Sequence, residues 1–184
     1  MASRKMRSAS PVFVSLIIFL GSCRKKRGMI KISINQGKVI IIDDDDFDRI
    51  SKYHWIVCKT GYVKTVVNYE TIILHRFIMN AKKGQQLDHV NGDTLDNRKE
   101  NLRFCSTSQN LANRKRFINN RSGYKGVDWR PIEKKFRARL SINKRAIHLG
   151  YFSDPKDAAF AYDRAAKEYF GSFARINFAE EKPC

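Results

Sequence analysis

The stretch from Leu87 to Arg114 gathers side chains whose types suit the hydrolysis of a phosphodiester bond. Its acids, amides and histidine include Asp88, His89, Asn91, Asp93, Asp96, Asn97, Asn101 and Asn110. A histidine titrates near neutral pH and can act as a general base. Carboxylate and amide oxygens hold hard divalent cations, which stabilise phosphate charge and a leaving oxygen. We therefore expect Asp88 and Asn110 to be metal ligands, His89 to be the base, and Asn101 to fix the His89 ring.

Two strands and a helix must position these groups. We predict a strand ending at Leu87-Asp88-His89, a turn at Asn91-Gly92-Asp93, and a second strand over 101–105. A helix should follow, capped by one of the hydroxyl residues at positions 106–108. Strand alternation places Asp88 and His89 on opposite faces unless the strand end twists. Asn91, Asp93 and Asp96 are interpreted as turn formers.

The charge of the chain indicates a polyanionic partner. Its 184 residues carry 36 Lys and Arg against 18 Asp and Glu, a net charge of +18. Nucleic acid is the first expectation and an acidic membrane surface the second. The four cysteines are far apart, and no CxxC pair occurs. This spacing argues against a zinc ribbon and a disulfide framework, and it favours reduced thiols in a cytosolic compartment.

Residues 1–28 differ from the rest of the chain. A basic start, the apolar run VFVSLIIFL and the basic run Arg24 to Arg27 have the outline of a secretory leader, with Cys23 at a loose lipoprotein-type cleavage site. The apolar run is too short to span a bilayer. Two interpretations stay open: the working protein begins at Met29, or the leader is a real targeting segment. We expect the first, with no membrane partner.

Residues 29–73 should form a β-rich lead-in unit. MIKISINQGKVIIID has the alternation of a hairpin. The acidic run Asp43 to Asp46 has two interpretations, a metal cluster or the cap of a helix over 47–53, and we favour the cap. Strands over 62–67 and 71–75 and a short helix over 76–79 complete this part. We expect His75 to pack or orient its neighbours and Arg76 to touch phosphate.

A resemblance becomes specific at residues 74–116, LHRFIMNAKKGQQLDHVNGDTLDNRKENLRFCSTSQNLANRKR. This segment resembles the HNH endonuclease family, in particular its homing-endonuclease branch in phages and organelles. The resemblance implies a ββα-metal nuclease domain, here 74–118, with Asp88 as metal ligand, His89 as general base, Asn101 as the residue that orients the base and Asn110 as second ligand. Asn110 stands where many members have histidine. Two oxygen ligands favour Mg²⁺ or Mn²⁺ over zinc.

Residues 122–178 form a separate pattern. We predict strands over 123–130, 135–142 and 145–152. A helix should follow, with Ser153 or Asp154 as its cap, Pro155 in its first turn and Gly171 at its end. The second strand alternates apolar and basic residues, so one face should be core and the other a row of positive charge. Such a face suits the major groove of DNA, because Arg can bind guanine or phosphate. The predicted DNA contacts are Arg76, Arg103, Arg114, Lys125, Trp129, Arg130, Arg137, Arg139, Lys144 and Arg145.

This segment resembles the DNA-binding domain of plant Apetala-type and ethylene-response-factor regulators. The likeness lies in YKGV at 124–127, HLGYF at 148–152 and AAFAYDRAA at 158–166. Phe136 replaces the usual strand tryptophan, and the basic Arg137 and Arg139 depart from the plant pattern, so no target sequence transfers. The fold class expected for the whole chain is α+β: a β-rich lead-in, a ββα-metal core, and a three-stranded antiparallel sheet packed on one helix.

The two resemblances together predict a DNA endonuclease of the homing or mobile-element type, acting on double-stranded DNA. The alternative is a non-catalytic DNA-binding protein, such as a transcription regulator, whose nuclease half has decayed, and an RNA-binding role is a third option. We expect a cytoplasmic, nucleoid-associated protein, or one encoded by a phage or organelle, with export as the alternative. The sequence leaves open the target site, the cutting of one strand or two, the oligomeric state and the host.

Overall fold

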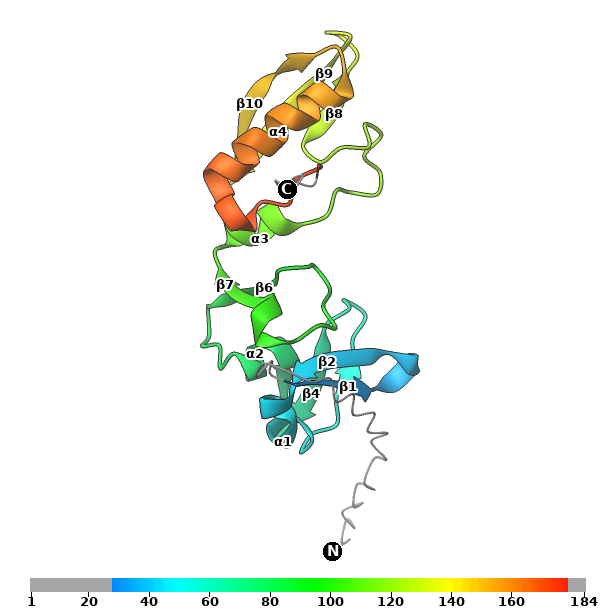
Figure 1. The fold of residues 1–184 in the computed structure, drawn as a ribbon, viewed down its shortest axis with the longest axis vertical. Helices are drawn as coiled ribbons and strands as arrows, with labels where there is room; N and C mark the ends of the chain where they lie inside the picture. The colour runs from blue at the N-terminus through cyan, green and yellow to red at the C-terminus, as the bar shows by residue number, and fades with distance from the viewer. Residues whose placement is uncertain (1–27, 179–184) are drawn as a thin grey trace, which may run out of the picture.

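The computed structural model describes residues 28–178. The predicted leader therefore falls outside the described residues except for Gly28. Figure 1 shows an elongated molecule, with the N-terminal sheets at one end, the C-terminal sheet and its long helix at the other, and β6, β7 and α3 between them. The expected α+β class is confirmed, because small antiparallel sheets alternate with a few helices. No helix within 28–178 is long and apolar enough to cross a membrane.

The N-terminal end consists of a two-stranded and a three-stranded antiparallel sheet with short helices. Its elements are β1 (Met29–Ser33), η1 (Asn35–Gly37), β2 (Val39–Asp43), η2 (Asp44–Asp46), α1 (Phe47–Ile50), β3 (Ile56–Val57), β4 (Val63–Val67), β5 (Glu70–Ile73) and α2 (Leu74–Ile78). The hairpin is present, with β1 paired to β2 from Met29 opposite Asp43. The short helices differ from expectation, since α1 ends at Ile50 and α2 begins already at Leu74.

The acidic run supplies Asp46 as the N-cap residue of α1, so it lies at the helix start as predicted. η2 and α1 have no side-chain cap hydrogen bond. Instead Asp46, which is buried, pairs with Arg49 at 3.2 Å and with Lys99 at 2.7 Å, and Asp43 accepts the backbone N–H of Lys99 at 2.8 Å. These carboxylates therefore tie the lead-in to the segment before β7. They do so by ion pairing across a long sequence separation, which a local capping rule does not anticipate.

The first core joins the lead-in to the segment that follows it. Ile40 and Ile42 of β2 pack with Leu74 and Ile78 of α2 and with Leu102. The loop after β6 also continues the sheet: Ile41 N–H donates to Leu95 O at 2.9 Å, and Asn97 N–H donates to Ile41 O at 2.7 Å. The apolar core thus crosses the predicted limit at 73/74. The domain limits themselves stay predictions.

The middle of the chain has the expected strand, strand and helix. It comprises β6 (Gln86–His89), η3 (Lys99–Asn101), β7 (Leu102–Cys105) and α3 (Thr107–Asn113). β6 pairs antiparallel with β7, and Asp88 lies opposite Arg103. Ser106 caps α3 in a capping box with Gln109. Asn101 lies in the short η3 turn instead of the predicted strand.

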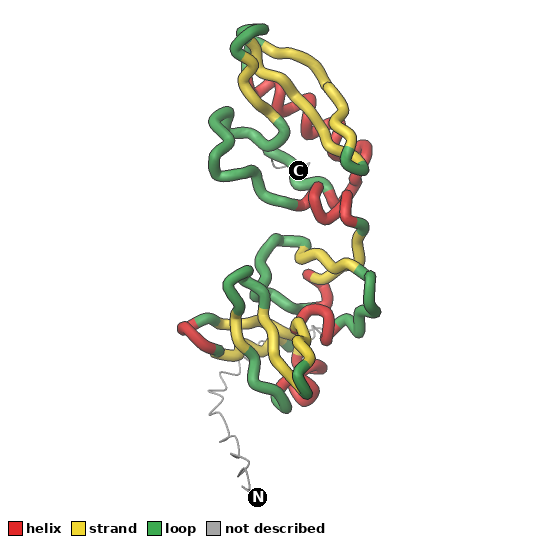
Figure 2. Tube along the Cα trace, turned by 180° about the vertical axis from the view of Figure 1, so that it is seen from behind, coloured by secondary structure: helices red, strands yellow, loops and turns green. Residues whose placement is uncertain are grey.

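The C-terminal end is a three-stranded antiparallel sheet in the order β10-β9-β8 with one long helix against it. Its elements are β8 (Val127–Arg130), β9 (Lys135–Ile142), β10 (Arg145–Phe152), α4 (Pro155–Phe170) and η4 (Gly171–Phe173). Figure 2 shows this helix along one side of the sheet. Alanines of α4 pack closely on β8 and β9. Ala112 of α3 joins the adjoining core with Tyr162 and Phe170, so α3 connects β6 and β7 to the C-terminal end of the molecule.

Candidate nuclease site

β6 and α3 bring three of the predicted site residues to one pocket. Asp88, His89 and Asn110 all line a pocket of about 160 Å³. Simple alternation would separate the first two, but β6 ends at His89, where Gly92 N–H donates to His89 O at 2.8 Å and turns the chain. Gly92 has φ of +72°, which the expected Asn-Gly turn requires. The remaining lining residues are Tyr62, Leu87, Gly92, Thr94, Asn113, Arg114, Lys115 and Arg175.

The His89 ring is buried against polar and aromatic neighbours. Its Nε2 lies 3.4 Å from Asn97 Oδ1, and its ring is T-shaped to His75 at 5.1 Å between centroids. Tyr62 lies 6.2 Å from it by the same measure. Burial lowers the pKa of His89, and the contact with Asn97 and the charge of Asp88 oppose that shift in part. The imidazole is therefore neutral at neutral pH, as a general base must be.

Asn97, and not Asn101, is the hydrogen-bond partner of the His89 ring. Asn101 Oδ1 accepts the N–H of Asn91 at 3.0 Å, and its Nδ2 donates to Asp96 O at 2.7 Å. The expectation that Asn101 holds the ring directly is therefore corrected. Asn101 fixes the two ends of the loop over 91–96. That loop in turn delivers Asn97, which is almost fully buried, to the histidine.

The loop over 91–96 is held by its own carboxylates and amides. Asn91 Oδ1 accepts Asp93 N–H at 2.7 Å, and Asp93 Oδ1 accepts Leu95 N–H at 2.9 Å. Asp96 accepts two hydrogen bonds from the Arg98 side chain, at 2.8 and 2.7 Å, and these bonds hold the pKa of Asp96 below its usual range. These residues act as turn formers, in agreement with the interpretation from the sequence.

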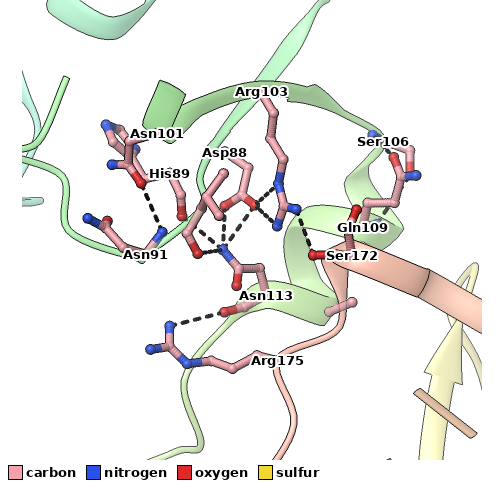
Figure 3. Close-up of polar contacts among 12 residues, drawn as sticks. Asp88, His89, Asn91, Asn101, Arg103, Ser106, Gln109, Asn113, Ser172 and Arg175 are labelled. Atoms are coloured by element: carbon pink, nitrogen blue, oxygen red, sulfur yellow. Dashed lines mark hydrogen bonds and ion pairs between the residues drawn. The ribbon is translucent and has the colours of Figure 1, made fainter. Parts of the chain in front are cut away.

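Asp88 is embedded in a network of donors (Figure 3). Arg103 donates to Asp88 Oδ2 from Nε at 3.1 Å and from Nη2 at 2.9 Å. Asn113 Nδ2 donates to both carboxylate oxygens, at 3.1 and 3.0 Å, and to His89 O at 2.8 Å. Asp88 Oδ1 carries the fewer hydrogen bonds of the two oxygens. It therefore has acceptor capacity directed at a further ligand.

The donor set fits a hard divalent cation with few protein ligands. Within residues 28–178 no group of three or more His, Cys, Asp or Glu could hold a metal ion. Asp88 and Asn110, however, offer one carboxylate and one amide oxygen on the same pocket. Mg²⁺ keeps several waters and is commonly held by one or two carboxylates together with substrate phosphates. The pocket suits such an ion better than zinc, which prefers nitrogen and sulfur ligands.

Three cations predicted to contact DNA have their side chains engaged within the protein. Arg76 donates to Gln85 O at 2.6 Å and to Lys82 O at 2.8 Å, so it closes the turn after α2. Arg103 is the partner of Asp88. The Lys125 amine donates to Ala112 O at the end of α3. For these residues the DNA contact stays a prediction, and each side chain has in addition a structural partner that local sequence does not reveal.

The C-terminal sheet has one face toward α4 and one outward. Arg137 and Arg139 alternate with the buried Ala138 and therefore point outward. Asp128 lies between them, 2.9 Å from Arg137 and 3.4 Å from Arg139. Trp129 pairs with Phe136 on the opposite face, with ring centroids 4.9 Å apart, so its expected place on the basic face is corrected.

The other predicted basic contacts lie around this sheet and the pocket. Arg139 has 52% of its side chain exposed, and Arg130 is partly engaged by Glu133 at 3.7 Å. Lys144 and Arg145 are exposed at the turn between β9 and β10. Arg114 lies on the rim of the pocket. The outward face is thus basic, with one acidic residue in the middle.

Asn113 and Arg175 of the site were not among the residues predicted from the sequence, and Asn97 was noted in the central stretch without a role. Asn97 reaches His89 through the loop, and Asn113 reaches Asp88 one helical turn beyond Asn110. The i to i+3 spacing of the two asparagines was a usable signal, because it places both side chains on one face of a helix. Arg175 enters from the far end of the chain, and no sequence signal pointed to it.

Comparisons with known proteins agree with this geometry. The HNH endonuclease family model matches residues 74–112. The chain is 28% identical over 150 residues to an uncharacterized HNH endonuclease of Acanthamoeba polyphaga mimivirus, covering 77% of this chain and 76% of the relative. It is 29% identical over 94 residues to Protein 3.8 of Escherichia phage T7, covering 51% and 77% respectively.

A third similarity concerns a smaller part of the chain. Dehydration-responsive element-binding protein 2E of Arabidopsis thaliana is 42% identical over 45 residues, which are 24% of this chain and 18% of the plant protein. No solved structure gives a significant match. The matched family segment contains Asp88, His89, Asn101 and Asn110, and the pocket unites three of them. Residues 74–112 are thus similar to HNH endonuclease domains, and they supply Asp88, His89 and Asn110 to the pocket.

Proposed function

We propose that this protein is a DNA endonuclease of the homing or mobile-element type, which hydrolyses a phosphodiester with one divalent metal and a histidine base. The observation that carries the proposal is the single pocket lined by Asp88, His89 and Asn110 inside the matched HNH segment. Viral relatives support a phage or mobile-element origin.

His89 is the general base in this proposal. The lowered pKa leaves the imidazole unprotonated at neutral pH, so a ring nitrogen accepts the proton of the attacking water. Asn97 holds the ring at Nε2, which fixes the direction from which the base approaches water. Asn101 and Asp96 support Asn97 indirectly, because the hydrogen bond between them holds the loop over 91–96.

Asp88 and Asn110 would hold the metal, Mg²⁺ or Mn²⁺. A bound divalent cation neutralises the charge that develops on the phosphate and on the leaving 3′ oxygen. Arg103 and Asn113 orient the Asp88 carboxylate, as outer partners of metal ligands commonly do. Arg114 and Lys115 on the rim add positive potential that holds the DNA backbone near the pocket.

We further propose that the C-terminal sheet binds duplex DNA through its outward face. The 42% identity with part of a plant protein named for binding a DNA element supports this role. Arg139 is the exposed cation at the centre of the face, whereas Asp128 holds Arg137 and reduces the local charge. DNA affinity should fall steeply with added salt through counterion release.

A plasmid cleavage assay tests the proposal. The wild-type chain should cut DNA with Mg²⁺ or Mn²⁺ and stop when a chelator is added. His89→Ala should lose about 10²–10⁴-fold in cleavage rate while binding DNA as before. Its matched control is His54→Ala, an exposed histidine outside the pocket. Binding without cutting by the wild-type chain under every metal tried would instead favour a DNA-binding protein with an inactive nuclease half.

A further inference from the structure

The segment after α4 returns to the nuclease site. Arg175 N–H donates to Ala112 O at the end of α3 at 3.1 Å. Just before it, Arg103 Nη1 donates to Ser172 O at 2.8 Å, and the Arg103 guanidinium lies 3.9 Å from the centre of the Phe173 ring. Figure 3 shows Ser172 and Arg175 beside the residues around Asp88.

The residues that follow Arg175 are also held in place by hydrogen bonds. Asn177 N–H donates to both oxygens of the Asp163 carboxylate, at 2.8 and 2.9 Å. The Asn177 amide exchanges hydrogen bonds with the backbone of Lys125, which donates at 2.6 Å and accepts at 3.1 Å. Arg175 therefore lies between two fixed points. Its position depends on the fold of the whole C-terminal half.

The Arg175 side chain projects into the pocket and has no ion-pair partner among residues 28–178. It lines the pocket with Asp88 and His89, and its Nη1 makes one long hydrogen bond, 3.5 Å, to Asn113 O. None of the described residues forms a salt bridge with it. A Cβ added to Gly92 would lie 2.7 Å from Nη1, so the glycine of the turn leaves the space that the guanidinium uses.

The described neighbours of Arg175 include further positive charge. Burial lowers the pKa of Lys125 to about 8, with a further contribution from the positive charge of Arg175. Lys115 of the rim also approaches Gly92. Arg175 lies at a pocket that contains a carboxylate and a histidine, and most of its N–H donors have no partner among residues 28–178. It is therefore positioned to bind an anion. Phosphate is the anion that a guanidinium fork matches best.

We propose that Arg175 binds the scissile phosphate in the nuclease pocket, so that the C-terminal half of the chain supplies one group of the active site. This inference rests on the proposed nuclease function. The guanidinium would donate to a non-bridging oxygen, where negative charge grows as the water attacks. It follows that residues 74–118 alone lack a group that the reaction uses. The segment over 172–177 would then connect the DNA-binding sheet to the cleavage site.

The test is single-turnover cleavage by the full chain with Mg²⁺. Arg175→Ala should cut about 10²-fold more slowly, as removal of one stabilising donor does in other enzymes, while the dissociation constant for DNA changes by less than about threefold. Arg175→Lys should recover part of the rate. Arg164→Ala, an exposed arginine on α4 outside this pocket, is the matched control and should cut as fast as wild type.

Chemical rescue separates a phosphate contact from a structural role. Free guanidinium at millimolar concentration should raise the Arg175→Ala rate and leave Arg164→Ala unchanged, and the melting temperature should match that of wild type. A rate for Arg175→Ala within threefold of wild type would overturn the inference. So would a slow variant that guanidinium does not rescue and that melts earlier. A wild-type chain that cuts no DNA refutes the proposed function itself, and the inference fails with it.

Discussion

Removing the Asp88 carboxylate should destabilise the fold as well as abolish cleavage. The Asp88 and Arg103 side chains are only 8% and 16% exposed, and they are joined by two hydrogen bonds. Asp88→Ala leaves the Arg103 guanidinium with Ser172 O and the Phe173 ring. Breaking a buried pair costs about 3–5 kcal/mol, and these remaining contacts place the expected loss near about 3 kcal/mol.

A double-mutant cycle separates the two roles of Asp88. Asp88→Ala should lower the melting temperature by about 6–12 °C, whereas Asp88→Ala combined with Arg103→Met should recover most of that loss because no buried charge remains unpaired. Urea unfolding gives the free energies, and plasmid cleavage is measured on the same samples. Both variants should fail to cut. A double variant as unstable as the single one, or one that still cuts DNA, would refute the reasoning.

Two further predictions follow from the buried polar groups of the site. Burial lowers the pKa of His75 to about 4 from 6.5, so the unfolded chain binds more protons in that interval and stability should fall as pH drops through it. From pH 7 to pH 5 the loss from this group is about 2 kcal/mol in urea unfolding; His75→Gln should abolish it, and the exposed control His54→Gln should not. Asn97→Ala should slow cleavage by about tenfold or more, because the base is no longer oriented, and it should also lower the free energy of unfolding, since Asn97 is buried and donates to Thr94 O at 3.2 Å. Asn101→Ala should lower the free energy of unfolding by about 2 kcal/mol, since it leaves a partly buried N–H and a buried carbonyl unpaired, but it should slow cleavage less than Asn97→Ala; a larger loss of rate for Asn101→Ala would contradict this division.

Local sequence accounts for most elements of the C-terminal half, although the first strand was expected over 123–130 and begins only at Val127. The strands over 135–142 and 145–152 were predicted at their observed limits, because alternation and the turn at Asn143-Lys144 define them. The helix start at Asp154 and Pro155 and its end at Gly171 were likewise expected. Capping and turn preferences act over a few residues, so they can be read without knowledge of the fold.

Local sequence also indicated much of the pocket. Asp88 and His89 are neighbours on a strand, and a capping box at Ser106 sets where α3 begins and hence where Asn110 lies. The hydrogen-bond partner of the His89 ring, in contrast, could not be predicted from local sequence. Asn97 and Asn101 are amides in the same short segment, and only the path of the loop over β2 decides which one reaches the ring.

The sequence did not indicate which individual basic side chains have partners inside the protein. The net charge of +18 indicates a polyanion, yet it does not say which cations stay free. Arg76, Arg103 and Lys125 are occupied by carbonyl or carboxylate oxygens that the fold brings to them, whereas Arg175 is brought to the pocket without an ion-pair partner among residues 28–178. The sequence by itself indicated most of the secondary elements and placed the side chains of Asp88, His89 and Asn110 on them, because these features depend on neighbours along the chain. The tertiary structure alone decided the partners of each buried polar group, because burial and long-range contacts set them.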